Sequence, residues 1–325
     1  MLTKMQENNI ISKLNERKID KNVQGYILDY CDANLSLFSD ICSLDEILDK
    51  LSTNVKKLEY SNLTGKNMGI FFGKEGTVRI DSKLRNDTTG ALKAVVLHQL
   101  DSAFVYDKEK NTCGIVLDGK NEGLNDGISS VKQQKYEEYF GLPQNLPSKY
   151  EKDFNEDLYH PNLKVATKVA NIVGLETLID SQKSNDYQRL KSEFSKNTSS
   201  HVNLDDISAS SDLLHPALAK PKDDIKKANK DISSNLKIAF IAKRCKDLGI
   251  DFDEHYYENL PKEKLNLELE KLDAFTNNTN SLDKKDIKPD FKNELSKYIV
   301  ADDEYTTKGY DENEEVKEKD INKVK

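Results

Sequence analysis

The 325-residue chain lacks an uninterrupted apolar run of the roughly 18 residues needed to cross a bilayer, which excludes an integral membrane protein. Its first residues are charged and polar and include no apolar stretch of signal length, so we expect no Sec export and a cytoplasmic location. Basic residues are not in excess, because 57 Asp and Glu against 49 Lys and Arg give a formal net charge of −8. Nucleic-acid binding usually relies on a basic face, so we expect neither nucleic acid nor a membrane among the partners.

Cysteine is scarce, and Cys31, Cys42, Cys113 and Cys245 lie far apart without a CxxC pair. This spacing predicts buried free thiols and argues against a disulfide framework or a cysteine zinc knuckle. The chain also lacks a G-x-S-x-G nucleophile elbow and a glycine-rich loop that ends in G-K-[ST]. Hydrophobic residues make up only 36% and charged residues 33%, so part of the chain should be solvated helix or tail.

Apolar residues at spacings of three and four predict amphipathic helices over residues 1–56. One of these helices should begin at Ser43, which forms a capping-box pattern with Glu46, and should continue to about Leu58. The pattern then changes, because a short apolar run, a glycine-containing turn and an alternating segment follow over residues 67–81. That order is typical of a β-hairpin.

The segment after the hairpin is expected to be mainly helical. A strongly apolar helix is predicted over residues 92–104, with Asp87 or the following threonines as its cap. A strand at Cys113–Leu117 should lead into a helix over residues 124–140, and a further helix is predicted over residues 162–181.

The C-terminal part is expected to be more polar. Residues 195–233 are rich in Ser, Asn, Asp and Lys, which predicts a linker or a poorly ordered loop before a helical region from 235 to 275. We expect four parts: an N-terminal helical segment at 1–56, a central domain at 57–197, a helical C-terminal region with a polar linker at 198–301, and a charged, disordered tail at 302–325.

One histidine on the 92–104 helix stands in an informative pattern, His98-Gln99-Leu-Asp-Ser102. In an H-E-x-x-H helix, two histidines at i and i+4 share a face and bind zinc, and the glutamate between them acts as general base for the metal-bound water. Here His98 occupies the first ligand position, Gln99 the base position and Ser102 the second ligand position. A lone histidine on an apolar helix is usually a core residue, so the pattern needs support from elsewhere in the chain.

That support comes from Gly123-Leu-Asn-Asp126-Gly-Ile128, which opens the next helix. This segment resembles the L-N-E-G segment through which many bacterial H-E-x-x-H peptidases supply a glutamate as third zinc ligand. With the order of hairpin, helix, strand and helix, it makes residues 60–195 similar to gluzincin-type zinc metallopeptidases of low-GC Gram-positive bacteria. The resemblance implies an α+β, mainly α, zincin-like fold, with a small antiparallel sheet packed on the active-site helix and a helical lower half. It also implies that His98 and Asp126 face one another.

Departures from the family pattern predict a degenerate zinc site. Gln99 has no carboxylate to accept a proton, and the loss of general-base help lowers a rate by about two to four orders of magnitude. Ser102 is a poor, short ligand, and Asp126 is one methylene shorter than glutamate. We therefore expect a catalytically inactive metallopeptidase-like protein with no cofactor, or with zinc if the site is still occupied. Its cleft, lined by an edge strand of the hairpin, would bind a peptide or protein partner.

Two alternatives stay open. In the first, His98, Asp101 and Asp126 form an altered site for a harder ion such as Mg²⁺ or Mn²⁺ in an active metal-dependent peptidase or hydrolase. Tyr159 and His160 could then stabilise an oxyanion. In the second, the protein is a structural or interaction protein that makes no use of a cleft.

Overall fold

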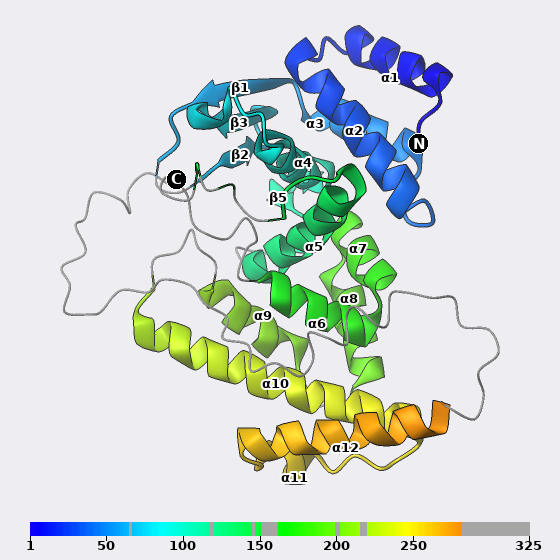
Figure 1. Ribbon diagram of the computed structural model, residues 1–325, viewed down its shortest axis with the longest axis vertical. Coiled ribbons are helices and arrows are strands. Elements are labelled where there is room, and N and C mark those ends of the chain that lie inside the picture. The colour runs from blue at the N-terminus through cyan, green and yellow to red at the C-terminus, as the bar shows by residue number, and fades with distance from the viewer. Residues whose placement is uncertain are drawn as a thin grey trace.

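The computed structural model describes residues 1–64, 67–116, 120–144, 147, 149–150, 162–198, 202–214 and 220–280 (Figure 1). The elements follow in the order α1 (Lys4–Glu16), α2 (Lys21–Leu37), α3 (Leu44–Asn54), β1 (Lys57–Ser61), β2 (Gly69–Phe72), β3 (Thr77–Asp81), a 3-10 turn (Ser82–Leu84), α4 (Ala91–Phe104), β4 (Tyr106–Asp107), β5 (Thr112–Cys113), α5 (Glu122–Phe140), α6 (Leu163–Val173), α7 (Leu175–Lys183), α8 (Tyr187–Asn197), α9 (Leu204–Leu213), α10 (Lys222–Leu248), α11 (Glu254–Glu258) and α12 (Lys262–Asn280). The protein is thus mainly helical with a small sheet, as the sequence predicts.

The three-stranded sheet is mixed, with the strand order β1-β3-β2. β2 and β3 are antiparallel, with Ile70 opposite Arg79, which confirms the predicted hairpin. β1 runs parallel to β3, with Leu58 opposite Val78, so the prediction of a purely antiparallel sheet is wrong. The hairpin is a local feature, whereas β1 precedes it and joins β3 through a long connection that strand patterning does not reveal.

The α3–β1 boundary also departs from the sequence prediction, since α3 ends at Asn54 and not near Leu58. The Ser43 hydroxyl accepts a hydrogen bond from the Glu46 amide at 3.3 Å, so the predicted N-cap is confirmed. At the other end, the Asn54 side chain donates to the carbonyl oxygens of Ala103 and Tyr106, at 2.8 and 3.0 Å. These tertiary contacts hold the chain as it leaves the helix and turns into β1.

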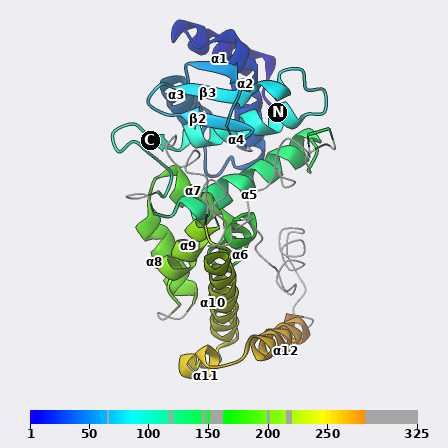
Figure 2. The same cartoon turned by 90° about the vertical axis from the view of Figure 1, so that its left-hand side faces the viewer.

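The sheet packs on α4, as the resemblance implies (Figure 2). The contact is close at Gly69 of β2, where an added Cβ would lie 2.7 Å from the Val95 side chain and 3.2 Å from that of Gln99. A side chain at position 69 would therefore separate β2 from α4. The side chains of Val78 and Ile80 in β3 are fully buried.

Two hydrophobic clusters form the core, and α5 contributes to both. The first joins α1–α4 and the sheet, and Tyr136 of α5 belongs to it. The second joins α6–α10 and α12, and Leu124, Ile128 and Val131 of α5 belong to it. Helix α5 therefore lies between an upper part that holds the sheet and a lower part made of helices (Figure 1).

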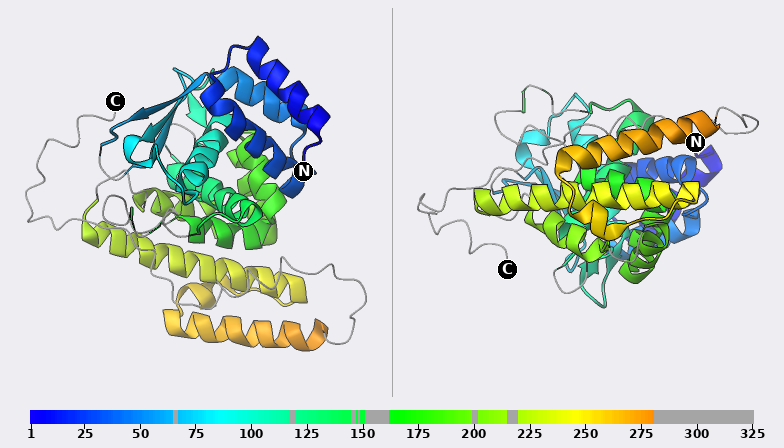
Figure 3. Two further views of the ribbon diagram at one scale, coloured as in Figure 1. Left: turned by 45° about the horizontal axis from the view of Figure 1, so that its top comes forward. Right: turned by 90° about the horizontal axis from the view of Figure 1, so that it is seen from below.

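The predicted linker over 195–233 is largely helical, which corrects the sequence prediction. α9 lies within it, and α10 begins at Lys222 rather than near residue 235. Apolar residues that are few but regularly spaced, such as Leu204 and Ile232, are buried, and the small side chains of Ser208 and Ser211 pack without any exposed surface. Figure 3 shows α10 beneath the lower helices with α12 along it. The predicted disordered tail at 302–325 lies outside the described residues. Within the described ranges, no helix is long and apolar enough to cross a membrane.

The strand predicted at Cys113–Leu117 is shorter than expected. Only Thr112–Cys113 is extended, and it pairs with β4. The chain turns at Gly114, whose φ of +58° favours glycine. Leu117 lies outside the described residues.

Candidate functional site

The structure brings together two of the residues singled out in the sequence, His98 on α4 and Asp126 on α5. Their Nε2 and Oδ1 atoms lie 3.6 Å apart, and their side chains are 17% and 27% exposed. The expectation that these two groups face one another is therefore confirmed. They meet because α4 and α5 pack side by side across the middle of the molecule (Figure 2).

Helix α4 is held in place at its N-terminus by Asp87. One carboxylate oxygen accepts hydrogen bonds from the backbone amides of Gly90 and Leu92, at 2.9 and 3.1 Å. The other oxygen accepts from the Tyr150 hydroxyl at 2.8 Å. A carboxylate at this end of a helix is also favoured by the helix dipole. The N-cap position itself is held by Gly90, which has no capping side chain, so Asp87 supplies the acceptor for the first turn from three residues earlier.

The charge on His98 is set by its neighbours. Burial by itself lowers the pKa of this imidazole, but the Asp126 and Asp101 carboxylates outweigh burial and raise the pKa above its usual value. The Nδ1 atom is buried and has no hydrogen-bond partner among the described residues. The Asp126 carboxylate therefore makes the imidazole of His98 hold a proton more tightly than a free histidine does, and a metal would compete with that proton.

Gln99 lies between α4 and β2 and is only 9% exposed. Its Cγ would lie 3.2 Å from a Cβ at position 69, so it packs against the backbone of the edge strand. An amide cannot act as a general base at physiological pH. Position 99, which corresponds to the general base of an H-E-x-x-H helix, is thus filled by a neutral, packed side chain.

Ser102 does not join the His98–Asp126 pair. Its hydroxyl donates to the backbone carbonyl oxygen of His98, one turn earlier in α4, at 3.4 Å. Hydroxyls in helices commonly make this kind of local hydrogen bond. Zinc requires at least three protein ligands, and here only the His98 imidazole and the Asp126 carboxylate face one another. These residues do not fit a zinc ion.

The alternative His98, Asp101 and Asp126 site is not supported by the geometry of Asp101. Asp101 is fully buried and forms an ion pair with Lys132 of α5, and it accepts a hydrogen bond from the Tyr30 hydroxyl at 2.8 Å. Both partners use the same carboxylate oxygen. Among the described residues, no group of three or more His, Cys, Asp and Glu side chains is placed to hold a metal ion. His160 and Tyr159 lie outside the described residues.

Lys132 and Tyr30 were not expected from the sequence. A signal was nevertheless present, because Lys132 falls four residues after Ile128 and four before Tyr136, within an apolar stripe of α5. A charged residue in such a stripe needs an opposite charge in the core. Asp101 supplies this opposite charge, and it likewise falls in an apolar stripe, four residues after Leu97 on α4.

The segment around Asp126 is anchored to the lower helices by polar contacts. The Gln182 side chain donates to the Asn125 carbonyl oxygen at 3.0 Å and to the Ser129 hydroxyl at 2.9 Å. Asp212 of α9 accepts hydrogen bonds from the backbone amides of Asn121 and Gly123, at 2.9 and 2.7 Å. These contacts fix the start of α5 and with it the position of Asp126.

Cys113 lies near the pair, in surroundings that disfavour its thiolate. Burial, and then the nearby carboxylates of Asp126 and Asp101, raise the pKa of its thiol to about 12. A thiol reacts as its thiolate, so these surroundings work against its reaction as a nucleophile.

The comparisons with known proteins identify no relative. No protein-family model, no curated protein and no solved structure matches the chain. The conclusions about function therefore depend on the geometry of the chain itself.

Proposed function

We propose that this protein is a metallopeptidase-like protein without catalytic activity that binds an extended peptide or protein segment beside α4. The observation that supports it is the 3.6 Å approach of His98 and Asp126, the positions of the first and third ligands in the resembling family. Two residues 28 positions apart in sequence meet as a peptidase ancestry requires.

Loss of catalysis follows from the residues around this pair. Gln99 supplies no base, and Ser102 is bonded to the backbone of its own helix. The raised pKa of His98 favours a proton on the imidazole, where zinc would need a free nitrogen lone pair. All three features act against hydrolysis of a bound peptide.

The binding surface in this proposal is the open edge of β2. Among the described residues β2 pairs with β3 alone, and the Met68 carbonyl oxygen accepts a hydrogen bond from the Asp81 amide at 2.8 Å. In an antiparallel ladder the bonded positions alternate, so the backbone groups of Gly69 and Phe71 point away from β3. A peptide added there would gain main-chain hydrogen bonds and lie next to Gln99.

The peptidase ancestry is tested by restoring the family residues. In the double variant Gln99→Glu with Ser102→His, we expect zinc to bind stoichiometrically and casein to be cleaved, whereas the wild-type protein does neither. The matched control adds Asp126→Asn to the same double variant and should lose the zinc again. A folded double variant that binds no zinc would contradict the proposed ancestry.

The binding surface is tested with peptides selected on the wild-type protein from a phage-displayed random heptapeptide library. Phe71→Pro removes the outward N–H of β2 without removing a ladder hydrogen bond, so it should abolish binding of the selected peptides. Phe71→Ala is the matched control, because it loses the same ring but keeps the N–H, and it should still bind. Equal binding by both variants would rule out the β2 edge as the binding surface, and selection of no peptide would argue for a purely structural protein.

A further inference from the structure

We propose that the peptide bound on the open edge of β2 carries an asparagine or glutamine side chain opposite Gly69, and that Gln99 recognises this carboxamide. The inference rests on the proposed function, because it concerns the same edge of β2. The observation behind it is the unpaired amide of Gln99 beneath that edge.

The amide of Gln99 is a polar group without a partner. Gln99 is 9% exposed, and its amide makes no hydrogen bond within the part of the chain that the structure describes. Neither amide atom is among the buried side-chain atoms that are sealed from solvent, whereas the Nδ1 atom of the neighbouring His98 is. Gln99 therefore has a donor and an acceptor that a bound molecule can reach.

The place of Gln99 beneath β2 decides which part of a peptide it meets. Its Cγ lies 3.2 Å from the position of a Cβ added to Gly69, on the face of β2 that packs on α4 (Figure 2). Residues directly opposite one another in neighbouring strands have their side chains on the same face, with Cβ atoms about 4.5–5.5 Å apart. The side chain opposite Gly69 therefore points toward α4 and Gln99, whichever direction the added strand runs.

The distances suit a short polar side chain at that position. The amide atoms of a glutamine lie about 2.4 Å beyond its Cγ, and a hydrogen bond adds about 3 Å. This reach covers the spacing between neighbouring strands, which is about 4.8 Å. The Gln99 amide can thus bond to the polar atoms of the opposite side chain.

A carboxamide matches Gln99 better than a charged or an apolar side chain does. It presents an acceptor oxygen and an NH₂ donor side by side, so two carboxamides pair reciprocally. A carboxylate only accepts, an ammonium only donates, and an apolar side chain would cover the Gln99 amide without pairing it. Val95 is 4% exposed and is another close neighbour of position 69, so the surroundings are apolar and an unpaired polar group there is costly.

The next inward position of the peptide favours an apolar side chain. Phe71 shares the inner face of β2 with Gly69, and its ring packs against that of Tyr106, with ring centroids 5.6 Å apart. An apolar residue opposite Phe71 extends this contact. Peptides for this edge therefore combine a carboxamide and an apolar residue two positions apart, and the residue between them faces outward beside Ile70.

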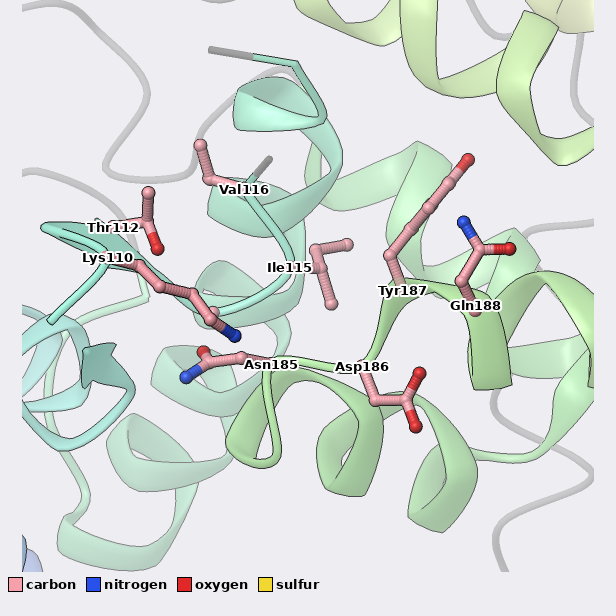
Figure 4. Close-up of a pocket in the computed structure, with 9 residues that line it drawn as sticks. Lys110, Thr112, Ile115, Val116, Asn185, Asp186, Tyr187 and Gln188 are labelled. Carbon is pink, nitrogen blue, oxygen red and sulfur yellow. The ribbon is translucent and has the colours of Figure 1, made fainter. Parts of the chain in front are cut away.

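The pocket between the β5–α5 connection and the α7–α8 turn does not offer comparable chemistry. Its volume is about 100 Å³, and Lys110, Ile115 and Asn185 are among the residues that line it (Figure 4). Ile115 is 1% exposed, and the side-chain oxygen of Asn185 is sealed from solvent. Lys110 is an exposed lysine paired with Asp107, so this pocket provides no buried polar group that a peptide could reach.

The inference is tested first on the heptapeptides selected from the random phage library on the wild-type protein. We expect their alignment to show Asn or Gln two positions from an apolar residue. The best-binding sequence is then synthesised with Asn, Asp or Leu at the carboxamide position and, as matched control, with the Asn exchanged with its outward neighbour. By isothermal titration calorimetry, the Asn form should bind about tenfold more tightly than the other three.

A protein variant assigns this preference to Gln99. Gln99→Met removes the amide and keeps the length of the side chain, so it should weaken the Asn peptide about tenfold and bind the Leu peptide at least as well as the wild type does. Gln188→Met replaces an exposed glutamine of α8 and is the matched control, which should leave both affinities unchanged. The melting temperature of Gln99→Met should equal or exceed that of the wild type, because the amide has no partner among the described residues.

The possible failures are distinguishable from that of the proposed function. Peptides that are lost in Phe71→Pro but bind Gln99→Met and the wild type alike would remove the role of Gln99 and leave the β2 edge as the binding surface. Equal binding of the Asn and Leu peptides would do the same. A marked fall in the melting temperature of Gln99→Met would show that the amide is used within the protein, which also overturns the inference. Selection of no peptide would overturn both proposals.

Discussion

Lys132 of α5 and Asp101 of α4 form an ion pair in which neither side chain has exposed surface. The Tyr30 hydroxyl of α2 donates to the same carboxylate, so three helices meet at one buried charge. The pair lies one helical turn from His98, whose pKa Asp101 helps to raise. It links the candidate site to the core of the upper part of the molecule.

Removing one member of this pair should destabilise the protein strongly. In Lys132→Met the Asp101 carboxylate stays buried without its cation, so the free energy of unfolding should fall by about 3–5 kcal/mol. Urea unfolding followed by circular dichroism measures this change. The double variant Lys132→Met with Asp101→Leu should recover much of the loss, and additive losses would show that the two charges are not coupled.

The Asp87 cap predicts a pH dependence of stability. Burial alone raises the pKa of Asp87, but hydrogen bonds from Thr89, Leu92 and Tyr150 outweigh it and hold the pKa well below its usual range. The stabilisation is therefore complete above the unfolded pKa, about 3.9, and is lost as the pH falls through the folded pKa.

The variant Asp87→Asn tests this dependence. We expect its free energy of unfolding to be lower than that of the wild type by about 1–2 kcal/mol at neutral pH. The difference should shrink once the pH falls below about 4, because the wild-type carboxylate then starts to lose its advantage. A difference that stays constant from neutral to acidic pH would contradict the assignment.

The His98–Asp126 pair has the opposite pH dependence. Because the folded pKa of His98 is raised, its stabilisation is complete below the unfolded pKa, about 6.5, and is lost as the pH rises through the folded pKa. Asp126→Asn should lower the pKa of His98, because burial disfavours the charged imidazole and the variant removes the carboxylate that offsets this effect. NMR titration of the imidazole measures this, with His255 of α11 as internal reference, and an unchanged curve would refute the pairing.

Two glycines of α5 allow a close helix crossing. A Cβ added to Gly127 would lie 2.4 Å from the Asn162 carbonyl oxygen, and one added to Gly123 would lie 2.3 Å from that of Ser211. Either alanine variant should therefore lower the melting temperature, with a loss of about 1–3 kcal/mol. Gly25→Ala in α2 is the matched control, because nothing lies within 4 Å of its added Cβ. It should stabilise the protein by about 0.5–1 kcal/mol through its higher helix propensity.

The spacing of apolar residues was sufficient to predict most of the upper helices and the hairpin. α4 has a continuous apolar stripe, and β2 and β3 are separated by a short glycine-containing turn, so each is encoded within a few neighbouring residues. The prediction of a linker at 195–233 was wrong because it was based on the polar composition of the segment. A few spaced apolar residues there, such as Leu204 and Ile232, are enough to bury one face of a helix.

The sequence by itself determined which residues form the helix of His98, the hairpin and the helix of Asp126, since helix and strand periods are local properties. Only the tertiary structure decided that β1 joins β3 in parallel and that Asp101 is taken by Lys132. It also left His98 facing Asp126. These outcomes depend on how distant segments pack, because a partner for a buried charge or an open strand can come from anywhere in the chain.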